Sequence, residues 1–93
     1  MTQPKPIDWV KVERLRQYMR LSQAEMAELF GVSRVTYYNW CKGKPVREEN
    51  AKRVRLALRK MVAVVNSGWP TQEVTALHHK ERMSRLVARL KTI

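Results

Sequence analysis

The segment that decides the fold runs from residue 21 to residue 44 and reads LSQAEMAELFGVSRVTYYNWCKGK. Ser22 is a favourable N-cap, and Glu25 three residues later completes a capping box. Apolar residues recur at helical spacing after this cap, which predicts a helix over residues 23–30. Gly31 follows, and glycine tolerates the left-handed backbone that ends many helices. The first half of the segment is therefore a short helix with a defined start and a defined stop.

The second half of the segment predicts another short helix, over residues 34–41. Ser33 is its N-cap, and only three residues separate the two helices. Such a pair is the arrangement of a helix-turn-helix. One side of the second helix is predicted to face the core through Val32, Tyr37 and Trp40. The other side is predicted to face outward through Arg34, Val35, Tyr38 and Asn39.

The rest of the chain also has helical periodicity, and nothing in it is typical of a strand. Further helices are predicted over residues 9–19, after the N-cap Asp8, and over 47–66 and 71–91. The helix over 47–66 is predicted to bury Ala51, Val54, Leu58, Met61, Val62 and Val65. The fold class is therefore all-α, a small five-helix domain. Residues 1–66 form its core, with a flexible basic arm over 1–6, and residues 67–93 form a C-terminal helical extension.

The composition is that of one small, strongly basic domain. The 93 residues carry 19 Lys and Arg against 8 Asp and Glu, a net charge of +11. The longest apolar run, Met61 to Val65, is far below the ~20 residues that a membrane span needs. The single cysteine, Cys41, excludes an internal disulfide framework. No secretory signal is visible in the polar N-terminus, so we expect a cytoplasmic setting.

The positive charge has three common explanations: a nucleic acid, an anionic membrane or an acidic protein as partner. A well-solvated basic surface without any such target is the fourth. We expect no membrane binding, although the last helix is basic and amphipathic.

No group of residues is spaced for catalysis or for metal binding. His78 and His79 are adjacent and would point about 100° apart on a helix. No glycine-rich phosphate loop is present. We therefore expect neither an enzyme nor a cofactor.

Residues 15–44 resemble the XRE/Cro-type helix-turn-helix family of phage and bacterial transcriptional regulators. The matching residues are Leu21 through Ser33, then Thr36, Asn39-Trp40 and Gly43-Lys44. Three positions depart from the family pattern. Tyr37 stands where Ile or Val is common, and a tyrosine there needs more room and a partner for its hydroxyl. Cys41 and Lys42 stand where the family tends to have Glu followed by Arg or Asn.

The resemblance implies a protein of the bacterial cytoplasm, in association with the nucleoid. It also implies that the second helix enters the major groove of double-stranded DNA. The residues at base-reading positions are then Arg34, Val35 and Asn39, with Tyr38 reaching a base or a phosphate. Arg34 is suited to guanine, Asn39 to adenine and Val35 to a thymine methyl group. The resemblance also implies phosphate contacts for Gln23, the helix N-terminus at Ser33, Lys42, Lys44 and Arg47.

The predicted C-terminal helix carries an apolar stripe that must be covered somewhere. We expect a homodimer whose interface includes Trp69, Met83, Leu86, Val87 and Leu90. These residues could instead close the core of a single chain.

The leading hypothesis is a small repressor that occupies an inverted-repeat operator as a dimer. An alternative is an antitoxin-like interaction protein whose C-terminal helix binds a protein partner. RNA binding through the same basic face is a third possibility.

Overall fold

The computed structural model describes residues 6–93, and residues 1–5, most of the predicted N-terminal arm, lie outside the described part. The described residues form six helices and no strand. Their bounds are α1 Trp9–Tyr18, α2 Gln23–Phe30, α3 Arg34–Cys41, α4 Glu48–Asn66, α5 Gln72–Thr75 and α6 His79–Lys91. The all-α class is confirmed, and the predicted bounds of α2 and α3 agree with the structure.

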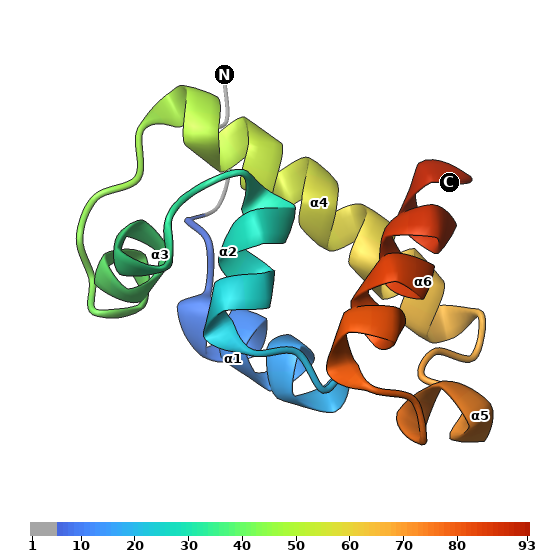
Figure 1. The fold of residues 1–93 in the computed structure, drawn as a ribbon. Helices are drawn as coiled ribbons and strands as arrows, with labels where there is room; N and C mark the ends of the chain where they lie inside the picture. The colour runs from blue at the N-terminus through green and yellow to red at the C-terminus, as the bar shows by residue number, and fades with distance from the viewer. Residues whose placement is uncertain (1–5) are drawn as a thin grey trace.

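The long helix α4 joins two halves of the molecule (Figure 1). At one end, α2 packs against both α3 and α4, and α1 packs against α3. At the other end, α6 folds back against α4. The helix α3 lies at the edge of the molecule away from α6, with one side open to solvent (Figure 1).

The predicted helix caps are present. Asp8 Oδ1 accepts a hydrogen bond from the Val10 amide at 3.1 Å, at the start of α1. Ser22 Oγ accepts from the Glu25 amide at 3.0 Å, and the Glu25 carboxylate accepts from the Ser22 amide at 2.8 Å. Ser33 Oγ accepts from the Thr36 amide at 3.1 Å. These side chains satisfy backbone donors that a helix start leaves without partners.

Glycine is favoured at position 31 by its backbone conformation. Its φ is +74°, in the left-handed region that other residues adopt at a cost. A Cβ atom there would lie 2.7 Å from Nη1 of Arg53 on α4, which is the end of a flexible, exposed side chain and can move aside. The guanidinium of Arg53 therefore packs directly over the turn between α2 and α3.

The predicted helix over residues 71–91 is divided, so the expected count of five helices becomes six. His78 caps the second part, α6, because its Nδ1 accepts from the Lys80 amide at 3.3 Å. Arg82 Nη1 donates to the Leu77 carbonyl at 2.9 Å, which satisfies an acceptor that the break exposes. The break contains neither glycine nor proline, so the sequence pattern carries no signal for it.

The buried side of α4 differs from the predicted stripe most clearly at Val62. Ala51, Val54, Met61 and Val64 are buried and Leu58 and Val65 are half-buried, whereas Val62 is 45% exposed. Val62 lies about 100° around the helix from Met61 and so misses the side that faces the core. The prediction of a buried Val62 is wrong, and Val64 takes that place.

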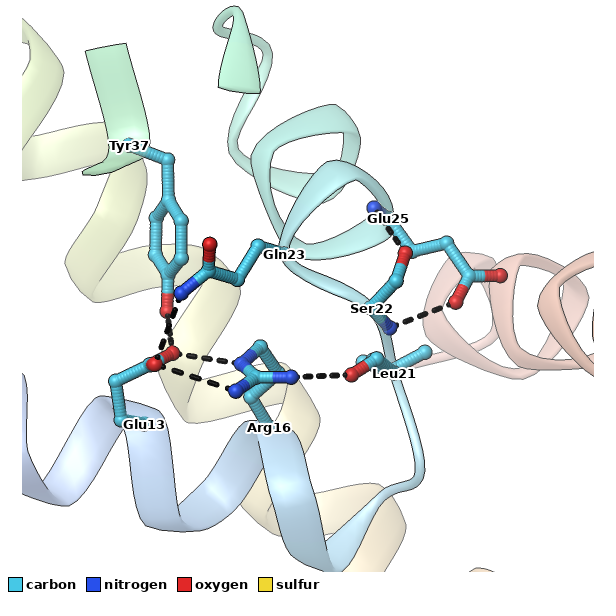
Figure 2. Close-up of polar contacts among 7 residues, drawn as sticks. All are labelled: Glu13, Arg16, Leu21, Ser22, Gln23, Glu25 and Tyr37. Carbon is cyan, nitrogen blue, oxygen red and sulfur yellow. Dashed lines mark hydrogen bonds and ion pairs between the residues drawn. The ribbon is translucent and has the colours of Figure 1, made fainter. Parts of the chain in front are cut away.

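The carboxylate of Glu13 on α1 connects the first three helices (Figure 2). It accepts a hydrogen bond from the Tyr37 hydroxyl on α3 at 2.5 Å and from Gln23 Nε2 on α2 at 3.2 Å. Arg16 forms an ion pair with it, Nε to Oε2 at 2.6 Å. Arg16 Nη1 also donates to the Leu21 carbonyl at 2.8 Å, in the link from α1 to α2. One carboxylate therefore fixes the position of α3 relative to α1 and α2.

The electrostatics of this cluster favour a charged Glu13 and a neutral Tyr37. The hydrogen bond from Arg16 lowers the pKa of Glu13, and the bonds from Tyr37 and Gln23 lower it further against the opposing effect of burial. Burial raises the pKa of Tyr37 far above its usual value, and donation to Glu13 adds to the rise. The tyrosine is thus a donor and the glutamate an acceptor at neutral pH.

We expect Tyr37→Phe to lower the free energy of unfolding by about 1.5–3 kcal/mol, because it removes a hydrogen bond to a charged acceptor. Urea unfolding at pH 7 measures this change. Tyr38→Phe on the same helix is the matched control, since Tyr38 is 47% exposed. It should change stability by less than about 0.5 kcal/mol. Equal effects of the two substitutions would contradict the role given to the Tyr37 hydroxyl.

The acid stability of the protein should depend on Glu13. Because its pKa is lowered in the folded chain, its contribution is fully present above about pH 4.3, the usual glutamate value, and is lost as the pH falls through the lower folded value. The stability difference between wild type and Glu13→Gln should therefore be constant from pH 7 to about pH 4.3 and should shrink below it. Urea unfolding across this range tests the prediction. Glu28→Gln, at an exposed position on α2, is the control and should keep the acid dependence of wild type.

Candidate nucleic-acid interface

The helix α3 has a buried side and an exposed side. Tyr37 is fully buried and Trp40 is 4% exposed, and Trp9 of α1 packs on Trp40 with ring centroids 5.5 Å apart. On the opposite side, Arg34 is exposed and Val35 is 63% exposed. The two faces predicted from the sequence are therefore present.

The exposed side of α3 forms a shallow hollow of about 250 Å³, lined by Arg34, Val35 and Tyr38. It combines a guanidinium with five N–H donors, a branched alkyl group and a phenol. Asn39, the fourth predicted base contact, lies at the edge of this side and is half-buried.

The turn after α3 places positive charge beside the hollow. Lys42, Lys44 and Arg47 are all exposed. The Asn39 carbonyl accepts hydrogen bonds from the amides of Lys42 and Lys44, which closes the turn. Lys42 Nζ lies 5.3 Å from the centre of the Tyr38 ring, a distance at which a cation is attracted to an aromatic face. The predicted phosphate contacts Lys42 and Lys44 thus lie directly after the exposed residues of α3.

The two other predicted phosphate contacts already have partners within the chain. Ser33 Oγ serves as the cap of α3 and also lies 2.9 Å from Thr36 Oγ1. Gln23 is in the first turn of α2 and donates one amide hydrogen to Glu13. A side-chain amide has two such hydrogens, so Gln23 keeps one donor for a further acceptor.

Glu13 and Arg16 are the residues that the sequence reasoning missed. The available signal is their opposite charge at i and i+3, which is common on helix surfaces and therefore weak. The stronger signal is the hydroxyl of Tyr37, which requires a partner in the core. The sequence does not say that the partner lies 24 residues earlier.

The thiol of Cys41 lies at the last residue of α3 and is half-buried. Burial raises the pKa of Cys41, which favours the neutral thiol. The side chain therefore adds no negative charge beside Lys42 and Lys44.

Three of the five residues predicted at a dimer interface are buried within this chain. Trp69 is 3% exposed, Met83 is 9% exposed and Leu86 is fully buried. Val87 and Leu90 are only half-buried and pack against the same core. The sequence leaves open that these residues close the core of a single chain. This alternative accounts for the three buried residues.

The described residues contain no cluster of His, Cys, Asp and Glu that could hold a metal ion. The rings of the two histidines contact each other at a tilt of 38°, with centroids 4.1 Å apart, and His78 serves as a helix cap. None of the helices described is long and apolar enough to cross a membrane.

A family model described as Helix-turn-helix matches residues 12–60, more than half of the chain. The match begins in α1, covers α2 and α3, and ends within α4. No curated protein and no solved structure matches the chain. The matched segment contains the caps of α2 and α3, Ser22 and Ser33. It also contains the left-handed Gly31 and the exposed side of α3. The chain belongs to the XRE-type helix-turn-helix family of DNA-binding regulators.

Proposed function

We propose that this protein is a small phage or bacterial transcriptional repressor that binds an inverted-repeat operator as a dimer, with α3 in the major groove. The observation that carries the proposal is the exposed side of α3, where Arg34, Val35 and Tyr38 lie together. Tyr37, on the opposite side of the helix, is buried in the core. A helix held this firmly on one side can present the other side to base edges without reordering.

The exposed side chains have the chemistry for direct readout. Arg34 can donate two hydrogen bonds to O6 and N7 of one guanine. Val35 can pack against a thymine methyl group, and Asn39 can pair with an adenine. Tyr38 is proposed to contact a base or a neighbouring phosphate. A site read by these residues is short, so a second copy on an adjacent half-site increases specificity.

Phosphate contacts are proposed on both sides of the reading residues. Lys42, Lys44 and Arg47 follow α3, and Gln23 and the start of α3 at Ser33 precede its reading residues. The net charge of +11 adds a long-range attraction to a polyanion. These contacts set the register of the protein on the duplex rather than the sequence that it prefers.

The proposed dimer forms on the operator, with one copy on each half-site. Trp69, Met83 and Leu86 are not required at its interface because they are buried in each chain. Occupancy of the operator would block a promoter that overlaps it.

Selection of bound duplexes from a random DNA library at ~150 mM salt tests the proposal. Wild type should enrich an inverted repeat. Arg34→Ala should weaken binding to that repeat by about 1–3 kcal/mol and relax preference at one position of each half-site. Arg59→Ala, which removes an exposed arginine from the second half of α4, is the matched control and should leave the selected sequence unchanged. Binding without an enriched sequence would contradict the proposal. Tighter binding to RNA than to duplex DNA would favour an RNA-binding protein instead.

The salt dependence of binding tests the phosphate contacts. Lys44→Ala should weaken binding equally on all duplexes and should reduce the slope of log K against log salt by about 0.9 for each phosphate that the variant no longer neutralises. Fluorescence anisotropy between about 50 and 200 mM salt measures this slope. Lys80→Ala on α6 removes the same charge from another exposed position and should preserve the slope. If both variants change the slope alike, Lys44 acts only through net charge.

A further inference from the structure

A groove of about 270 Å³ lies where α4 meets α6 and the end of α2. Its apolar lining includes Leu29, Met61, Val87 and Leu90. Leu56, at the same groove, is 48% exposed. An apolar cavity of roughly 150 Å³ holds a benzene ring, so this groove has room for bulky apolar side chains. None of the exposed residues of α3, and none of the residues in the turn after α3, line it.

The charged side chains that line this groove are all basic. Arg53, Lys60 and Lys91 line it, and no acidic side chain is among the described residues that do so. The groove between α1 and α4 differs, because its charged residues are of both signs: Asp8 accompanies Lys11 and Arg55. The α4–α6 groove therefore has an apolar lining with uniformly basic charged groups.

This charge selects among the possible occupants. A second copy bound about a two-fold axis would bring its own Arg53, Lys60 and Lys91 against those of the first. Like charges placed opposite one another at an interface are unfavourable. A nucleic-acid backbone would satisfy the cations but has no apolar side chains to fill the groove. A protein segment with apolar and acidic side chains satisfies both features.

We propose that the α4–α6 groove binds an amphipathic helix of a partner protein, with apolar side chains inside the groove and carboxylates against Arg53, Lys60 and Lys91. Helices recognised in this way place anchors at i, i+3, i+4 and i+7. The proposal is independent of the proposed operator binding, because the groove is formed by α2, α4 and α6 rather than by the exposed side of α3.

The test uses a synthetic amphipathic helix of about four turns, with leucines at i, i+3, i+4 and i+7 and glutamates beside them. A second peptide has lysine in place of every glutamate. The glutamate peptide should bind the full chain, and the amide resonances of Ala57 and Leu90 should shift during titration while those of Arg34 and Val35 stay fixed. The lysine peptide should bind at least about tenfold more weakly.

Charge-reversed variants locate the site. The double variant with Lys60→Glu and Lys91→Glu should bind the glutamate peptide at least about tenfold more weakly than wild type does. The control, Lys52→Glu combined with Lys80→Glu, makes the same change in net charge on exposed positions of α4 and α6 outside the groove and should bind like wild type. Circular dichroism and urea unfolding report whether each variant is folded.

Three results would overturn the proposal. One is equal binding of the two peptides, and another is equal weakening by the two double variants. The third is a dimer in sedimentation experiments that Leu56→Glu converts to a monomer, which would assign the groove to a second copy. None of these results bears on the sequence selected by α3, so failure here is distinguishable from failure of the proposed repressor.

Discussion

The hydrogen bond from Tyr37 to the carboxylate of Glu13 is the interaction on which the placement of α3 depends. A helix of eight residues has little stability of its own, because so few backbone bonds offset the cost of its first turn. Apolar packing by Tyr37 and Trp40 holds one side of α3 against the core, but such packing is not directional. The bond to a fixed carboxylate is directional, and it sets the rotation of α3 about its axis.

The same carboxylate also receives the amide of Gln23, so α2 and α3 share one anchor on α1. A free carboxylate near a DNA backbone would repel it, and the ion pair with Arg16 offsets that charge within the cluster. The lowered pKa of Glu13 and the raised pKa of Tyr37 describe the same preference for one protonation state. The exposed side of α3 is thus positioned by polar groups that lie beneath it and are separate from the residues proposed to read DNA.

Local chemistry made much of this fold predictable from the sequence. The caps Asp8, Ser22 and Ser33 and the left-handed Gly31 act over one to three residues, and all are present. The sequence also indicates that the Tyr37 hydroxyl needs a hydrogen-bond partner. That the partner is Glu13 depends on how three helices meet. The break before α6 was not readable, because the interactions that stabilise it come from His78 and Arg82 rather than from glycine or proline.

The wrong prediction of a buried Val62 also depends on how the helices meet. Periodicity gives the apolar side of a helix to within one residue, whereas the neighbour decides which residue is covered. Val64 replaces Val62 in the core because the packed side of α4 is rotated by a fraction of a turn. Likewise, the stripe of the C-terminal helix required a cover, but only the fold identifies α4 of the same chain as that cover. Dimer contacts could not be separated from core contacts by pattern alone, since both need apolar residues at helical spacing.

The position of Arg53 joins the two halves of the molecule. Its guanidinium packs over Gly31 in the turn between α2 and α3, and Nη2 donates to Asn50 Oδ1 at 2.9 Å. The same side chain lines the α4–α6 groove. Leu29, near the end of α2, also lines the groove. The segment that positions α3 and the groove beside α6 therefore share two side chains, so a ligand in the groove contacts the helix-turn-helix directly rather than through the length of α4.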